Sequence, residues 1–406
     1  MNNERRKYAS RRERLIRVII NEYRAIFTDG GVLLILLFAP LIYATIYSTA
    51  YAPEVVRRVP IGVIDNSRTS QSRQLTSALD SGDRCSVAYQ PCDMNEARTL
   101  LFERKIYGVV LIPDSYASDM EAGRQSVVSI YADASYFLFY RQVVEQAVLT
   151  IGNIGANIRE VRLCDAGRGA DFATNSAVGI TETTHNLYNP SLGYGTFVMP
   201  AVLMVILQQT LLIGVCMIGG TRREHRIGYS EGVTSECEGG SAVILLFGKM
   251  VVYGSIYSLS SLYLLTLHYR LFGYPMNGAT SDVVLFMALY ITTCTLFAIA
   301  VSTLFRHRES ALLLLLWSSI PILMLSGASF PREAIPRWLY NAGAIFPSSS
   351  GVEGLIRLQT MGATLRDVAP LIWRLIILAL LFFVLAIFGL RRQLVGDWVK
   401  KEGDNP

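Results

Sequence analysis

Charged residues are scarce in this chain. Only 17% of its 406 residues are charged, and 51% are hydrophobic, whereas a soluble domain carries about 25% charged residues. This deficit excludes an ordinary soluble globular protein. Six apolar stretches account for it, each close to the roughly 20 residues that cross a hydrocarbon core of about 30 Å. They cover residues 32–50, 197–218, 250–267, 283–305, 311–330 and 369–390. The sequence therefore predicts an α-helical polytopic membrane protein with six transmembrane helices.

The sequence also lacks the motifs of familiar catalytic and nucleotide sites. It has no phosphate-binding Gly-x4-Gly-Lys-Ser/Thr loop, because Gly248 and Lys249 are followed by a methionine. It has no His-Glu-x-x-His run and no Gly-x-Ser-x-Gly elbow. Its four histidines are far apart and suggest no metal site. These absences predict a chain that is not an enzyme, binds no cofactor and does not itself bind ATP through such a loop.

Ionisable side chains are almost absent from the six apolar stretches, which argues against a proton-driven carrier. The deepest polar side chains include Gln208 and Gln209 in the second stretch. They are candidates to line a route for an amphipathic cargo. The alternative, in which such residues hydrogen-bond across helix pairs, is favoured for any single one of them.

Lysines and arginines gather at the ends of the apolar stretches. Eight precede residue 32, and others lie in segment 219–249 and in the tail 391–406. Because cytoplasmic loops are enriched in these residues, both termini are predicted to be cytoplasmic. Nucleic-acid binding, which the net charge of +5 also allows, is disfavoured because the arginines flank spans and have no interleaved aromatic residues.

Residues 1–31 carry an amphipathic pattern. Leu15, Ile19, Tyr23 and Ile26 recur at helical spacing, with arginines on the other side. This pattern predicts a helix in the plane of the membrane surface. A cytoplasmic helix packed on protein remains the alternative.

The chain changes character between the first two spans. In residues 52–193, β-rich runs such as IGVID and GVVLIP alternate with helical stretches such as NEARTLLFERK. This order predicts an inserted, mixed α/β domain on the extracytoplasmic side. Among the six cysteines, a disulfide between Cys85 and Cys92 is possible by location, but their spacing does not decide it.

Two segments within 197–390 do not fit regular spans. Segment 219–249 begins with a dense basic and acidic cluster and ends in small residues before Gly248. It is either a rigid projection that receives force or a solvated loop. Segment 327–355 contains Pro331, Pro336 and Pro347, which end helices. Backbone that leaves a span at membrane depth needs polar partners, so two half-helices that dip into the membrane are predicted here.

Taken together, these segments resemble the permease subunits of type-two ATP-binding-cassette (ABC) exporters, in the branch with a large domain after the first span. The coupling segment of that family is matched by Glu224, Gly228, Gly248 and Lys249. Its re-entrant hairpin before the last span is matched, in order, by Ser326-Gly327, Phe330-Pro331, Pro336-Arg337-Trp338-Leu339 and Phe346-Pro347.

The resemblance implies an efflux permease in the bacterial inner membrane that moves drugs, lipids or similar amphiphiles outward. Its expected partners are cytoplasmic ABC ATPase subunits that hold the ATP, a second permease copy or paralogue, and a periplasmic adaptor. The expected ATPase-coupling residues are Arg223, Glu224, Arg226, Gly228 and Lys249. The expected pathway and outer-gate residues are Gln208, Gln209, Pro331, Pro336, Pro347 and Glu353, the last facing water or pairing with Arg357. The alternative function is a polytopic receptor or scaffold whose α/β domain binds a ligand.

Overall fold

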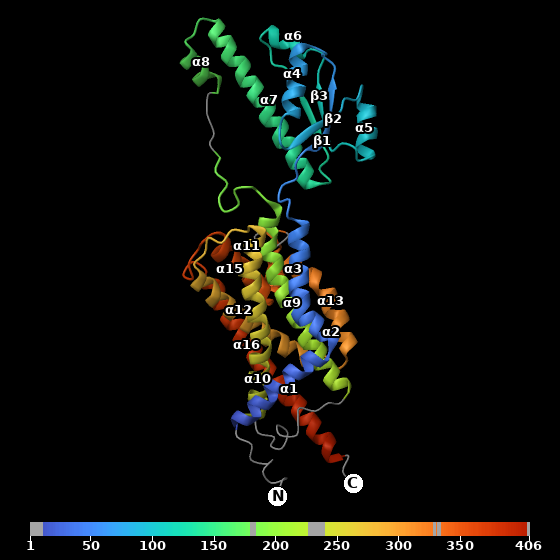
Figure 1. Ribbon diagram of the computed structural model, residues 1–406, viewed down its shortest axis with the longest axis vertical. Helices are drawn as coiled ribbons and strands as arrows, with labels where there is room; N and C mark the ends of the chain where they lie inside the picture. The colour runs from blue at the N-terminus through green and yellow to red at the C-terminus, as the bar shows by residue number, and fades with distance from the viewer. Residues whose placement is uncertain (1–10, 179–183, 226–239, 328–329, 331–333, 404–406) are drawn as a thin grey trace. The chain divides into compact units, whose positions relative to one another are not determined.

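The computed structural model describes residues 11–178, 184–225, 240–327, 330 and 334–403 (Figure 1). The chain divides into two compact units. One comprises Val55–His185, and the other is formed by the chain on either side of it.

The second of these units is helical and contains six helical segments that are long and apolar enough to cross a membrane. They confirm the helical, polytopic class predicted from the apolar stretches. The spans are Gly30–Ala50, Tyr194–Glu224, Ala242–Phe272, Thr280–Ser302, Arg308–Leu325 and Ala369–Leu394. The first consists of α2 (Gly30–Leu33), η1 (Leu34–Phe38) and α3 (Ala39–Ala50), and the third of α10 (Gly240–Tyr263), η2 (Leu264–His268) and α11 (Tyr269–Phe272). The others are α9 (Tyr194–Glu224), α12 (Thr280–Ser302), α13 (Arg308–Leu325) and α16 (Ala369–Gly403).

Helix α9 is the centre of the helical unit (Figure 1). It packs against α3, α12, α13 and the short helix α15 (Pro347–Leu355), and 94% of its most apolar stretch is buried, against 18% for α13. Glycines permit this close packing. A Cβ on Gly214 would lie 2.3 Å from the side chain of Leu36. Residues of α9 are therefore surrounded by other helices of the same chain.

The other unit is built on a four-stranded sheet. Its strands are β1 (Val59–Asp65), β2 (Cys85–Tyr89), β3 (Gly108–Ile112) and β4 (Ser129–Ala132), in the spatial order β2-β1-β3-β4. Strand β1 is parallel to β2 and β3, whereas β4 is antiparallel to β3. The helices are α4 (Ser70–Asp80), α5 (Met94–Phe102), α6 (Tyr116–Glu121), α7 (Phe137–Asp165) and α8 (Ala170–Ala177). This confirms the mixed α/β insertion between the first two spans.

Both faces of this sheet are covered, which explains its β-branched strands. On one face, Val63 of β1 packs in a core with Leu75 of α4 and Val143 of α7. On the other, Ile64 packs with Ala97 of α5. The alternation of strand and helix in the sequence therefore corresponds to helices on both sides of the sheet.

Cys85 and Cys92 are free in this unit. The thiol of Cys85 is buried and donates to the backbone oxygen of Gln142 at 3.6 Å, and its burial raises the pKa of the thiol to about 12. Cys92 is exposed. The disulfide that the sequence left open is not formed.

Candidate coupling and pathway sites

Helix α1 (Arg11–Thr28) lies along α10 at the C-terminal end of α9. Val18, Glu22 and Ile26, spaced four residues apart, are its buried residues. Ile20 and Phe27 stay 58% and 59% exposed. The helix thus packs on the bundle with one stripe and presents a second, apolar stripe outward, so it combines features of both arrangements considered from the sequence.

The carboxylate of Glu22 is 1% exposed and joins three helices. It accepts hydrogen bonds from Lys249 Nζ at 2.8 Å and Tyr253 Oη at 2.5 Å, both on α10. It also pairs with Arg222 Nη2 on α9 at 2.6 Å. Because Arg222 precedes and Lys249 follows residues 226–239, one buried carboxylate binds the chain on both sides of that segment.

The charge of Glu22 depends on these partners. Burial by itself raises the pKa of the carboxyl group, but Lys249, Arg222 and the hydrogen bonds from Lys249 and Tyr253 outweigh burial and lower the pKa to about 2. Glu22 is therefore ionised at neutral pH.

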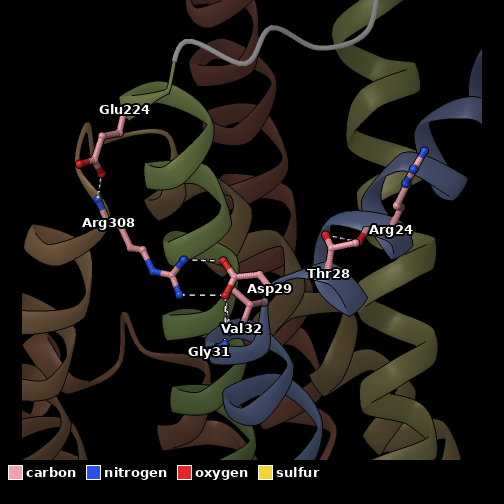
Figure 2. Close-up of polar contacts among 7 residues, drawn as sticks. All are labelled: Arg24, Thr28, Asp29, Gly31, Val32, Glu224 and Arg308. Atoms are coloured by element: carbon pink, nitrogen blue, oxygen red, sulfur yellow. Dashed lines mark hydrogen bonds and ion pairs between the residues drawn. The ribbon is translucent and has the colours of Figure 1, made fainter.

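A second ion pair joins the junction of α1 and α2 to the start of α13 (Figure 2). The guanidinium of Arg308 contacts both carboxylate oxygens of Asp29, with 2.9 Å between Nη2 and Oδ1. Asp29 Oδ1 also accepts the backbone N–H groups of Gly31 and Val32, each at 3.1 Å, and so caps α2. The hydrogen bond from Arg308 is the main cause that lowers the pKa of Asp29. Glu224 completes the junction, because its Oε2 accepts from the backbone N of Arg308 at 3.2 Å.

Arg223 connects α9 to the C-terminal end of α12, where the turn that leads to α13 begins. Its guanidinium donates to the backbone oxygens of Phe305 at 2.5 Å and Ser302 at 3.5 Å, and to that of Thr303. These carbonyls lie at the C-terminal end of α12, where a cation satisfies them and interacts well with the helix dipole.

The structure thus brings together three of the five expected coupling residues, Arg223, Glu224 and Lys249, each bonded to another helix of the chain. Arg226 and Gly228 lie outside the described residues. Sequence reasoning missed the partners Glu22, Asp29 and Arg308. A signal for Glu22 existed, since it lies between Val18 and Ile26 on an otherwise apolar helical stripe.

The expected pathway residues Gln208 and Gln209 lie near the middle of the 31-residue helix α9. Gln208 is 1% exposed, and its Oε1 accepts the backbone N–H of Ser348 at 2.7 Å. Ser348 is the second residue of α15, so Gln208 caps the N-terminus of that helix. Gln209 is 6% exposed, and neither of its amide atoms has a partner among the described residues.

Helix α15 runs antiparallel to α12. From the N-terminus of α12 onward, the ring of Phe286 meets Gly354, and the ring of Tyr290 meets Gly351. Further along, the ring of Phe297 lies 6.1 Å from that of Phe346, just before α15. A Cβ on Gly351 or Gly354 would lie 2.3 or 2.1 Å from these tyrosine and phenylalanine rings, respectively, so only glycine fits at the two contacts. The first turn of α15 therefore lies deep in the bundle.

The remaining gate candidates lie around α14 (Arg337–Gly343) and α15. Pro336 immediately precedes α14, and Pro347 is the first residue of α15, a position where proline is favoured. Glu353 pairs with Arg357, the partner that the i,i+4 spacing predicts. Pro331 lies outside the described residues. Within the described part of the chain, no group of three or more His, Cys, Asp or Glu side chains is arranged to hold a metal ion.

Comparisons with known proteins agree with this architecture. The family described as ABC-2 family transporter protein matches residues 31–388. This range covers the six spans, the first from residue 31 and the last up to residue 388, and the α/β unit between the first two. The chain is also similar to the inner membrane transport permease YhhJ of Escherichia coli (strain K12) and to that of Shigella flexneri. Each is 23% identical over 385 residues, which cover 92% of this chain and 96% of the relative. The chain belongs to the ABC-2 transporter family and is a transport permease, with ATP hydrolysis on a separate subunit.

Proposed function

We propose that this permease sits in the bacterial inner membrane, with both termini in the cytoplasm and the α/β unit on the outer side, and exports amphipathic molecules such as drugs or lipids. Two copies, or one copy and a paralogue, form the pathway. A cytoplasmic ABC ATPase binds each, and a periplasmic adaptor docks on the α/β unit. The location is supported by the relatives, whose names describe inner membrane permeases, and the orientation by the basic residues near the C-terminal end of α9.

The observation that carries the proposal is that one carboxylate joins α9, which precedes residues 226–239, to α10, which follows them. Glu22 binds Arg222 and Lys249, on either side of this segment, and Glu224 and Arg308 extend the connection to α13. A displacement of this segment by the ATPase would thus reach α1, α9, α10 and α13 together. In this proposal Arg226 and Gly228 contact the ATPase, whereas Arg223, Glu224 and Lys249 transmit the movement.

Substitutions at the proposed ATPase contact should weaken binding of the ATPase without destabilising the helical bundle. Gly228→Pro and Arg226→Glu are expected to reduce co-purification of the ATPase subunit and its stimulated ATP hydrolysis, because one alters the local backbone and the other reverses a charge. Arg306→Glu is the matched control, since Arg306 is exposed and lies in the turn between α12 and α13. Wild-type co-purification and turnover in both test variants would contradict the coupling assignment.

We also propose that segment 327–355 is a re-entrant hairpin that closes the pathway from the outside. The contact between Ser348 and Gln208 supports this, because it brings the start of α15 level with the middle of α9. Pro336 and Pro347 would define where its two short helices begin, and Glu353 would lie near the outer mouth with Arg357.

Replacing these prolines should change how well the hairpin closes the pathway. In complexes reconstituted in vesicles, Pro336→Ala and Pro347→Ala are expected to raise the number of ATP molecules hydrolysed per molecule exported, because the short helices can then extend or reorient. Export and ATP hydrolysis would be measured together, with Pro190→Ala, in the segment before α9, as the control. Unchanged ratios in both variants would indicate a connector and no gate.

A further inference from the structure

The first turn of α15 and the facing part of α9 contain buried polar groups that the fold does not use. Ser348 and Ser350 are 0% exposed, and their hydroxyl groups have no partner among the described residues. The same holds for Gln208 Nε2 and for both amide atoms of Gln209. We refer to Gln208, Gln209, Ser348 and Ser350 as the polar layer.

The polar layer lies halfway along α9. At a rise of 1.5 Å per residue, Gln208 is roughly 20–25 Å from either end of this helix. If α9 crosses the bilayer, the layer is close to the midplane, where leaving a polar group unpaired is costly. An apolar residue at position 209, 348 or 350 would avoid that cost, and only the Oε1 of Gln208 is used to cap α15, so the remaining polar groups need an explanation other than stability.

The electrostatics of the layer favour a negatively charged ligand. A helix N-terminus carries a partial positive charge, and α15, with nine residues, directs its N-terminus at the amide of Gln208. The acidic residues of α9, α12 and α15 are Glu224, Asp282 and Glu353, and all lie outside the layer. A cation would meet no carboxylate there, whereas an oxyanion would meet the amide N–H groups and the serine hydroxyls.

We propose that the polar layer binds the oxyanion head of the cargo, a carboxylate, sulfonate or phosphate, while the apolar helices accommodate its tail. This inference rests on the proposed export function and adds the chemical class of the cargo. In other transporters, half-helix N-termini near the midplane point at the anionic groups of substrates. Because the layer is closed in this conformation, cargo enters when α15 separates from α9. That movement breaks the bond between Ser348 N–H and Gln208 and frees a further donor.

The proposal is tested on the permease with its ATPase in phosphatidylcholine vesicles. Three probes with the same dodecyl chain are compared below their micellar concentrations: a sulfonate, a trimethylammonium and a neutral maltoside. A separate arm replaces part of the phosphatidylcholine by phosphatidic acid. We expect ATP hydrolysis to be stimulated by the sulfonate, if soluble amphiphiles are the cargo, or by phosphatidic acid, if lipids are, and by neither of the other probes.

Gln208→Glu is the decisive variant. Its carboxyl group still accepts the N–H of Ser348, so the cap of α15 is retained, but the two N–H donors of Nε2 are replaced by a single carboxyl oxygen. The half-maximal concentration of the anionic probe is expected to rise roughly 10–100-fold, the effect of one lost hydrogen bond to a charged group. Gln209→Leu should also weaken the response, while its melting temperature stays at or above that of the wild type, because unpaired polar atoms are removed from the interior.

Thr292→Val is the matched control. Thr292 is also a polar residue within a span, but its hydroxyl donates to the backbone oxygen of Ala288 in its own helix at 2.7 Å. The Thr292→Val variant should retain the wild-type preference for anionic probes. Equal stimulation by all probes, no response to any of them while ATP hydrolysis proceeds, or an unchanged preference in Gln208→Glu would each overturn the anion site. Failure of the ATPase to associate with the permease would instead count against the proposed function.

Discussion

Replacing Glu22 by alanine is expected to lower the free energy of unfolding by roughly 3–5 kcal/mol, because it removes the carboxylate that pairs with the buried Lys249 and the partly buried Arg222. Lys249, only 2% exposed, would lose its ion pair with Glu22 at 2.8 Å, and Arg222 would lose its ion pair with Glu22 at 2.6 Å. Denaturant or thermal unfolding of the purified permease in detergent would measure the loss.

The control for this prediction is Asn21→Ala, which changes the exposed residue next to Glu22. A second comparison separates stability from transmission. Glu22→Leu combined with Lys249→Met should recover much of the stability, since apolar residues can replace a buried ion pair, but should not restore transport coupled to ATP hydrolysis. If Glu22→Ala unfolds like the control, the three-helix connection contributes nothing to the fold.

The contribution of Glu22 should also depend on pH. Its carboxyl pKa falls from 4.5 to about 2 in the folded chain, so the folded state binds fewer protons than the unfolded state in that range. The stabilisation is complete above about pH 4.5 and is lost as the pH falls towards 2. The difference in stability between the wild type and Glu22→Gln should therefore shrink over this interval.

Gly220→Ala is expected to separate α9 from the start of α13 and to reduce coupled transport. A Cβ at this position would lie 2.8 Å from the backbone N of Arg308 and 2.9 Å from its Cα. Backbone atoms cannot rotate away as a side chain can, so α13 has to shift, at a cost of roughly 1–3 kcal/mol. That shift would disturb the bonds of Arg308 to Glu224 and Asp29 (Figure 2).

Gly254→Ala is the same substitution at another glycine, and here we expect the protein to become more stable. Gly254 lies in the interior of α10, and a Cβ there would meet nothing within 4 Å. Alanine should stabilise this helix by about 0.5–1 kcal/mol. Unfolding and transport of the two variants would be compared side by side, and equal effects would exclude steric contact with Arg308 as the cause.

The six spans and the inserted sheet could be predicted because both depend on local patterns: continuous apolar stretches and alternating strands and helices. The central position of α9 in the bundle could not be predicted in this way. Its sequence is no more apolar than that of α16, yet 94% of its apolar stretch is buried, against 28% for α16. Lipid tails are as apolar as a protein interior, so composition does not distinguish a helix surrounded by protein from one surrounded by lipid.

In the candidate sites, too, local arrangements were predictable and contacts between distant residues were not. The sequence drew attention to Lys249 and Gln208, but the contacts of these residues depend on chain segments that are far away. Lys249 binds Glu22 across 227 residues, and Gln208 binds Ser348 across 140. Glu353 and Arg357, one helical turn apart, were predictable as a pair because helix geometry alone brings them together.

The bond between Glu22 and Lys249 has a consequence for biosynthesis. Glu22 leaves the ribosome 227 residues before its partner, an interval of roughly 10–45 s at the usual speeds of translation. During that time its carboxylate has no cation from α10 and stays hydrated, since burying it alone would be too costly. We therefore expect helix α1 to dock on the bundle only after the third span has been made, as a late step in the assembly of the nascent chain.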